Sequence, residues 1–289
     1  MNQYEAVFFD WDGTAVLSRR APADDAAAAM RPLLEKGVKL VVVSGTTIEN
    51  IAGGRLGDYF TEGQLKNLYL GLGRGAHNYA FRGGEPYVFA DRLPDMGTLE
   101  AVHRTAFEVH MELKREYGLD TDIVFSRPNY CKIDLSVSHD RGESLFMQGD
   151  EPERLRELLS GHGIRGGLSQ LIQVARRAGE RNGVFVKATC DAKYLEVGIS
   201  DKSDNVDAIL GRLSEECGVR PERCAYFGDE FIGIEPGIFG SDSFMRTERT
   251  KEGDFFDVSD MPGERPEGVR VLGGGVRRFL SFLEEQSRE

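Results

Sequence analysis

The sequence predicts an α/β protein whose core is a Rossmann-like parallel sheet with helices on both faces, together with an inserted α/β cap domain. Continuous apolar runs of strand length occur at residues 6–9, 38–43 and 224–227, as is typical of parallel strands that are buried on both sides. Helix patterns lie between these runs, which favours right-handed strand–helix–strand crossovers. From about residue 93 the pattern changes, and the core-like alternation resumes only after residue 197.

The first part of the chain alternates between predicted strands and predicted helices. A helix pattern covers residues 23–36, where Gly37 stands as a C-terminal stop. A second helix start follows the strand at 38–43, beginning at Ile48, and a third strand is predicted at 67–71. Residues 76–91 alternate as a hairpin. These elements are predicted to form the first half of the core.

The middle of the chain reads as a separate α/β module. A long amphipathic helix is predicted at 96–117 and a shorter one at 153–160, with strands at 131–138, 184–189 and 194–197. After this module, a helix at 205–217 and the strand at 224–227 return to the core pattern. The predicted domains are therefore a core of residues 1–91 and 198–289 and a cap of residues 92–197.

Composition narrows the class of protein. The chain has 289 residues and a formal net charge of −12, and an acidic surface repels phosphate backbones, which disfavours nucleic-acid binding. No apolar run reaches the length of a membrane span, and the N-terminal apolar stretch contains acidic residues, unlike a signal peptide. Four cysteines without a CxxC pair indicate reduced thiols. We therefore expect a cytoplasmic protein that binds neither nucleic acid nor membranes.

Polar residues follow three of the predicted core strands directly. Asp10 and Asp12 come after the first strand, Ser44 after the second, and Asp229 after the strand at 224–227. Ligands of open parallel sheets bind outside the carboxyl ends of the strands, so we expect these side chains to converge. Lys202 stands just before the helix that leads into the Asp229 strand.

These residues carry a family resemblance. The segments FFDWDGT (8–14), VVVSGTT (41–47), Lys202 and YFGDE (226–230) resemble, in order, the four motifs of the haloacid dehalogenase superfamily, whose members are mostly phosphatases. The large insertion between the second and third motifs resembles the α/β cap of the Cof-type sugar phosphatases. The resemblance spans the whole chain, and its first motif is the most specific.

The resemblance implies a mechanism, and it agrees with what phosphoryl transfer requires. Asp10 would attack phosphorus and form an aspartyl-phosphate, and Asp12 would serve as general acid and then as general base. Ser44 would hydrogen-bond a phosphate oxygen, and Lys202 would supply positive charge.

The resemblance also implies a cofactor and a substrate site. Mg²⁺ is the expected ion, held by an Asp10 carboxylate oxygen, the Asp12 carbonyl and Asp229. Next to Ser44, Gly45 and Thr46 are expected to bind substrate. In the cap, the strand that begins after Arg127 and contains Lys132 is similar to one that offers a lysine to sugar phosphates, although both residues could equally decorate an exposed strand face.

The fourth motif departs from the family pattern. Cof-type enzymes usually carry a second acid four residues after the first, but Gly233 occupies that position here. We expect Glu230, which resembles the paired acids of trehalose-phosphate phosphatases, to replace it as a metal ligand. The alternatives are Glu235, one helical turn further on, or water.

The leading functional hypothesis is a Mg²⁺-dependent phosphatase that acts on a small phosphorylated metabolite, first of all a sugar phosphate. A phosphomannomutase-like phosphomutase is the nearest alternative enzyme. A catalytically silent phosphate-binding regulator is a third reading, because the fourth motif is incomplete in sequence.

Overall fold

The computed structural model describes residues 4–138, 150–191 and 193–288 of the chain. These residues form two compact units. The first contains Met1–Asp91, Asp201–Ile232 and Asp242–Glu289, and the second contains Arg92–Ser200 and Gly233–Ser241. The segment 233–241, which the sequence assigned to the core, therefore belongs to the second unit.

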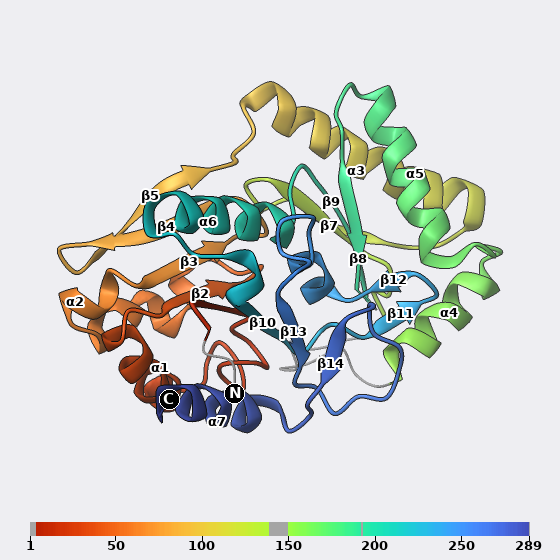
Figure 1. The fold of residues 1–289 in the computed structure, drawn as a ribbon. Helices are drawn as coiled ribbons and strands as arrows, with labels where there is room; N and C mark the ends of the chain where they lie inside the picture. Colours follow the sequence, from red (N-terminus) through yellow and green to blue (C-terminus); the bar gives the residue numbers. More distant parts are fainter. Residues whose placement is uncertain (1–3, 139–149, 192, 289) are drawn as a thin grey trace. The chain divides into compact units, whose positions relative to one another are not determined.

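The first unit is built on one eight-stranded sheet (Figure 1). Its strand order is β14-β13-β10-β1-β2-β3-β4-β5, and the pairs from β14 to β3 are parallel, whereas β3-β4 and β4-β5 are antiparallel. The strands are β1 (Ala6–Phe9), β2 (Lys39–Val43), β3 (Leu68–Leu72), β4 (His77–Arg82), β5 (Glu85–Asp91), β10 (Cys224–Gly228), β13 (Asp254–Asp257) and β14 (Val269–Val271).

Helices cover both faces of this sheet because the central strands are apolar on both sides. In β1, Val7 and Phe9 join the core formed with α1 (Asp24–Glu35) and α7 (Gly275–Arg288). Ala6 and Phe8 of the same strand face the other way, into the core formed with α6 (Lys202–Cys217). The continuous apolar run of β1 is thus explained by burial on two faces, and the predicted fold class is confirmed.

The helix expected after β2 is replaced by short turns. Three 3₁₀ segments, η1 (Ile48–Asn50), η2 (Ala52–Gly54) and η3 (Leu56–Tyr59), precede the one-turn helix α2 (Glu62–Leu65). Ala52, Gly53 and Gly54 all have positive φ, a conformation that a right-handed helix excludes. The prediction of a regular helix starting at Ile48 is therefore wrong.

The second unit contains a four-stranded antiparallel sheet with helices on one face. The sheet has the order β6-β7-β9-β8, and α3 and α5 pack against it. Its elements are α3 (Met96–Tyr117), β6 (Asp122–Val124), β7 (Tyr130–Asp134), α4 (Glu151–Gly161), α5 (Gly167–Arg181), β8 (Lys187–Cys190) and β9 (Tyr194–Gly198). A small hairpin of β11 (Gly233–Glu235) and β12 (Ile238–Phe239) completes the unit.

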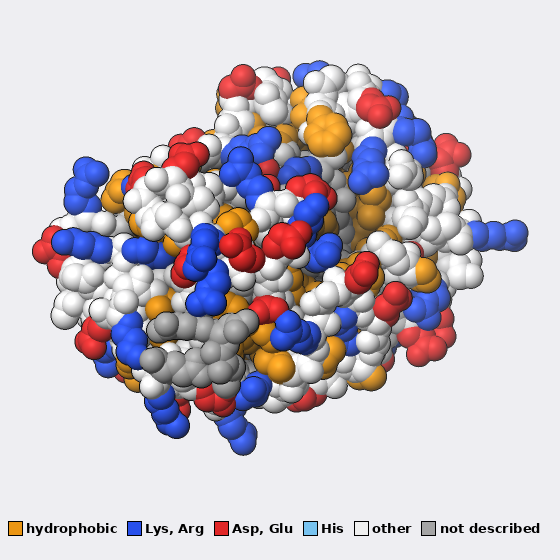
Figure 2. Space-filling view, in the orientation of Figure 1, with side chains coloured by type: hydrophobic (Ala, Val, Ile, Leu, Met, Phe, Trp, Pro, Cys, Tyr) orange, Lys and Arg blue, Asp and Glu red, His pale blue; other side chains and the backbone are white. Residues whose placement is uncertain are grey.

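Two surface properties bear on function. Among the described residues, no helix combines the length and the apolar character that crossing a bilayer requires. Figure 2 shows basic and acidic side chains intermingled over the face in view. Neither sign of charge forms a separate patch on this face.

Candidate active site

The register of the central strands brings the ends of β1, β2 and β10 together. Phe9, the last residue of β1, pairs with Val42 on one side and Phe227 on the other. The amide of Asp10 donates to the Phe227 carbonyl over 3.0 Å. Ser44 and Asp229 follow the neighbouring strands within two residues of these partners, so the topology places the first, second and fourth motifs at one edge.

Three carboxylates meet at this edge. Oxygen atoms of Asp10, Asp229 and Asp242 lie within 4.8 Å of one another. Asp242 is a residue that the sequence did not single out, and its carboxylate is the third acid of this cluster. Glu230, the expected replacement, is not one of the three, and its role as a metal ligand stays a prediction.

Asp242 is fully buried and held by two donors. Its Oδ1 accepts a hydrogen bond from Lys202 Nζ over 2.7 Å, and its Oδ2 accepts one from the Glu230 amide over 2.8 Å. A Cβ atom on Gly228 would overlap the Asp242 carboxylate. The glycine at the end of β10 is therefore needed to admit this acid from a distant part of the chain.

The first-motif loop holds Asp229 in a similar way. Thr14 Oγ1 donates to Asp229 Oδ1 over 2.9 Å. Gly13 has a φ of 81°, and a Cβ there would overlap the Asp229 carboxylate. The glycine thus allows both the left-handed turn and the close approach of the acid.

Lys202 lies between Asp10, the expected nucleophile, and Asp242. It is the first residue of α6, whose start is fixed by a capping box between Asp201 and Asp204. Its Nζ lies 3.3 Å from Asp10 Oδ1 and 2.7 Å from Asp242 Oδ1, and the residue is only 5% exposed. Burial opposes its charged form, but the carboxylates of Asp10 and Asp242 raise the pKa of Lys202 above its usual value. The lysine therefore stays charged beside Asp10.

Burial dominates the electrostatics of the acids. It raises the pKa of Asp10, with Lys202 opposing and Asp242 adding to the increase. It raises the pKa of Asp229 well above the ordinary value, and Asp242 and Glu230 add to this. Oδ1 of Asp10 and Oδ1 of Asp12 are buried and accept no hydrogen bond from the described residues. One lysine therefore stands against the carboxylates of Asp10, Asp229 and Asp242, and a hard divalent cation such as Mg²⁺ fits the remaining negative charge.

Asp12 has a different partner. Its Oδ2 accepts a hydrogen bond from Arg19 Nη2 over 3.0 Å. Burial raises the pKa of the Asp12 carboxyl, and the Arg19 charge and hydrogen bond oppose that increase. Asp12 therefore has an ion-pair partner of its own, Arg19.

The second motif forms a buried turn beyond β2. Ser44 donates its amide to the Gly71 carbonyl over 2.9 Å, and its Oγ lies 3.4 Å from the Thr46 amide. Thr46 Oγ1 accepts from Asn50, whereas Gly45 is exposed and a Cβ there would meet nothing. Ser44 and Thr46 are thus fixed at the strand end, and Gly45 is open.

Arg127 and Lys132 belong to the second unit. Lys132 Nζ pairs with Glu196 Oε1 over 3.1 Å and lies over the Tyr194 ring. The Nε atom of Arg127 is buried and has no hydrogen-bond partner among the described residues. Lys132 therefore forms an ion pair and a cation–π contact within its own sheet.

Glu235, the alternative acid, has a structural position instead. Both of its carboxylate oxygens accept from the amide of Leu168, over 3.0 and 2.9 Å, at the N-terminal end of α5. A carboxylate there is stabilised by the helix dipole and the free amides. Both carboxylate oxygens of Glu235 are thus engaged at α5, and its role as a metal ligand stays a prediction.

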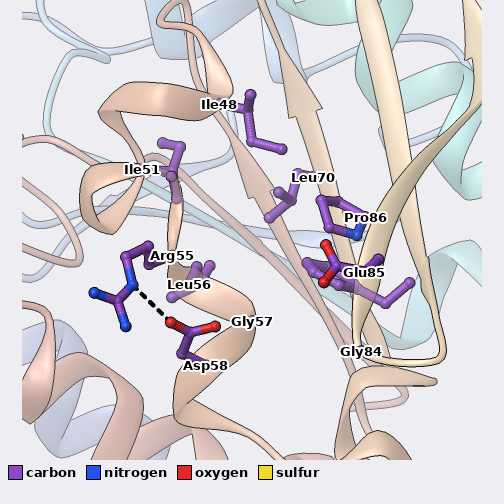
Figure 3. A pocket seen from close by; sticks show the side chains of 12 residues that line it. Ile48, Ile51, Arg55, Leu56, Gly57, Asp58, Leu70, Gly84, Glu85 and Pro86 are labelled. Atoms are coloured by element: carbon purple, nitrogen blue, oxygen red, sulfur yellow. Dashed lines mark hydrogen bonds and ion pairs between the residues drawn. The ribbon is translucent and has the colours of Figure 1, made fainter.

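A small cavity lies elsewhere in the first unit. Its volume is about 50 Å³, enough for a water molecule or two. Figure 3 shows Ile48, Leu70 and Pro86 lining it, with the Arg55–Asp58 ion pair beside it. None of the candidate site residues lines this cavity, so it is separate from the acid cluster.

Comparisons with known proteins give the fold. No protein-family model matches the chain, and no curated protein matches it. Solved structures do match, among them IMP-bound Plasmodium falciparum IMP-nucleotidase, with a TM-score of 0.61 and 13% identity over 99% of this chain and 69% of that one. Trehalose-6-phosphate phosphatase of Aspergillus fumigatus gives 0.55 and 15% over 100% and 94%. The C-terminal domain of the C. albicans trehalose-6-phosphate phosphatase gives 0.58 and 14% over 99% and 93%. The chain therefore shares its fold with these solved structures.

Proposed function

We propose that this chain is a Mg²⁺-dependent phosphatase that hydrolyses a small phosphorylated metabolite, first of all a sugar phosphate, through an aspartyl-phosphate on Asp10. The observation that carries the proposal is the Asp10 carboxylate at the end of β1, 3.3 Å from Lys202 and grouped with Asp229 and Asp242. A buried carboxylate beside a lysine, grouped with two further acids that would hold a divalent cation, suits a nucleophile that must meet a phosphate dianion.

The chain's own residues account for both chemical steps. In the first, an Asp10 oxygen bonds to phosphorus, the ester P–O bond breaks, and Asp12 gives its proton to the leaving oxygen. In the second, Asp12 takes a proton from water as the water oxygen bonds to phosphorus and the bond to Asp10 breaks. Lys202 and Ser44 offset charge on the phosphoryl oxygens.

Asp10, Asp229 and Asp242, with the Asp12 carbonyl, would hold Mg²⁺, and the ion would supply positive charge that lets the phosphate approach a carboxylate. The position of Asp242 in this cluster supports an active enzyme over the catalytically silent alternative.

A sugar is favoured by the polar side chains that the second unit's sheet carries. Lys132 pairs with Glu196 there, and Lys193 pairs with Asp134 over 3.2 Å, while α3 and α5 pack on the sheet. Alternating charged and hydroxyl-bearing side chains suit hydrogen bonds to sugar hydroxyls. A phosphate-release screen over sugar phosphates, sugar acids, nucleotides and cofactors, with and without Mg²⁺, tests the function. No release from any of them would contradict it, and transfer dependent on a sugar bisphosphate would indicate a mutase.

Lys132→Ala is expected to weaken the sugar-phosphate substrate selectively. The substitution removes the charge that pairs with Glu196, so we expect kcat/KM to fall by about 10- to 100-fold for the physiological substrate and by less than about threefold for p-nitrophenyl phosphate. Lys251→Ala, an exposed lysine of the first unit, is the control. An equal loss on both substrates, or none on either, would remove Lys132 from the site.

Mg²⁺ is expected to stabilise the protein more at high pH than at low pH. Because the pKa values of Asp10 and Asp229 are raised, the metal-free folded chain holds protons that the unfolded chain releases near pH 4, so its free energy of unfolding falls as pH rises above about 4. Deprotonated acids bind the cation, so the Mg²⁺-induced increase in Tm should be larger at about pH 8 than at about pH 5. Thermal unfolding checks this without an activity assay, and a pH-independent increase would contradict it.

A further inference from the structure

The loop that follows the nucleophile folds back on itself. The Gly13 amide donates to the Val16 carbonyl over 2.7 Å, and the Val16 amide donates to the Trp11 carbonyl over 3.0 Å. Asp12 and Val16 form an isolated bridge. This tight turn reverses the chain, so that Arg19, seven residues after Asp12, returns to the Asp12 carboxylate.

The contact between Arg19 and Asp12 is asymmetric. Arg19 Nη2 donates to Oδ2 of Asp12 over 3.0 Å, while Oδ1 is buried and accepts no hydrogen bond from the described residues. The Arg19 side chain is 31% exposed and that of Asp12 is 9% exposed. Oδ2 of Asp12 is therefore fixed by Arg19, whereas Oδ1 is buried and has no hydrogen-bond partner among the described residues.

We propose that Arg19 is a positioning residue for proton transfer: it holds one oxygen of Asp12 so that the other is presented to the leaving-group oxygen. The inference rests on the proposed phosphatase function. A carboxyl group fixed at one oxygen loses most of its rotational freedom, and proton transfer requires a donor within hydrogen-bond reach. Arg19 need not contact the substrate for this role.

The role predicts a dependence on the leaving group. In Arg19→Met, the rate of phosphoenzyme formation should fall by about 10- to 100-fold for a sugar phosphate, whose alkoxide needs a proton. For p-nitrophenyl phosphate the fall should stay below about threefold. The rate is followed as the pre-steady-state burst of released alcohol, because breakdown of the intermediate also uses Asp12. Arg19→Lys, which keeps a donor, should lose less than Arg19→Met, and Arg20→Gln is the matched control on the adjacent exposed arginine.

A double-mutant cycle with Asp12→Asn separates positioning from a general structural role. If Arg19 acts through Asp12, then Arg19→Met should change the rate of Asp12→Asn by less than about threefold. Equal losses on both substrates, or fully additive effects in the double variant, would overturn the inference while leaving the phosphatase intact. Thermal unfolding of each variant excludes a folding defect. A wild-type protein without phosphatase activity would overturn the proposed function and this inference with it.

Discussion

Replacing Asp10 with asparagine is expected to lower the rate of phosphate release by at least about 10³-fold. Asparagine keeps the shape of the side chain but removes the anionic oxygen that bonds to phosphorus. It also leaves Lys202 paired with Asp242, so the neighbouring contact is retained. Steady-state phosphate release at saturating Mg²⁺ measures the loss.

Two controls make this result specific to the nucleophile. The Tm of Asp10→Asn should stay within a few degrees of wild type, because the substitution removes one of several buried like charges rather than a packing group. Asp25→Asn, an exposed acid in the first turn of α1, should keep full activity. If Asp10→Asn retained more than about a tenth of the wild-type rate, Asp10 would not be the nucleophile.

Replacing Asp242 with asparagine is expected to raise the Mg²⁺ concentration for half-maximal activity by about 100-fold or more. The substitution removes one of the three clustered carboxylates and one of the two anionic partners of Lys202. The neutral amide also presents an NH₂ group toward one of the two donors that Asp242 now accepts from. A Mg²⁺ titration of phosphate release checks the shift.

Glu235→Gln is the matched control for Asp242→Asn. It makes the same change of charge seven residues earlier, at a carboxylate that caps α5, and should leave the Mg²⁺ titration unchanged. Glu230→Gln is expected to fall between the two, with an increase of about tenfold. If Asp242→Asn titrated like wild type while Glu230→Gln did not, the acid that completes the site would be Glu230.

The ends of the core strands were predictable because a short stretch of sequence, an apolar run followed by a polar residue, marks each of them. An apolar run followed directly by Asp10 predicts a buried strand with an acid at its end, and the same reasoning places Ser44 and Asp229. Parallel strand order then brings these ends to one edge without any knowledge of side-chain contacts. Lys202 was expected from its place just before the predicted helix 205–217 and from its resemblance to the third motif, and the structure makes it the first residue of that helix.

Asp242 was not predictable from spacing. The hairpin of β11 and β12 separates it from Asp229 by 13 positions, and that hairpin packs with the second unit rather than with the acids. Its carboxylate is placed by a long-range hydrogen bond from Lys202, and it lies against Gly228, which has no side chain to exclude it. The available signal was weak: a glycine at the end of β10 that needs room for another side chain.

The turns after Ile48 and the contact between Arg19 and Asp12 both depend on backbone turns that residue types indicate only in part. The helix expected at Ile48 gives way to turns because Ala52 joins Gly53 and Gly54 at positive φ, and an alanine there is not anticipated from sequence. Arg19 reaches Asp12 only because the Gly13 turn reverses the chain. An arginine on a polar loop otherwise reads as an exposed charge.

Trapping the covalent intermediate tests directly whether Asp10 is the residue that is phosphorylated. The protein is mixed with a turned-over phosphate ester and Mg²⁺, quenched in acid, digested and examined by mass spectrometry. We expect a phosphoryl group on the peptide that contains Asp10, present in wild type, absent in Asp10→Asn and released by hydroxylamine, which cleaves acyl phosphates. Phosphate release by wild type with no phosphorylated Asp10 under any quench time, or with the phosphoryl group on another residue, would contradict it.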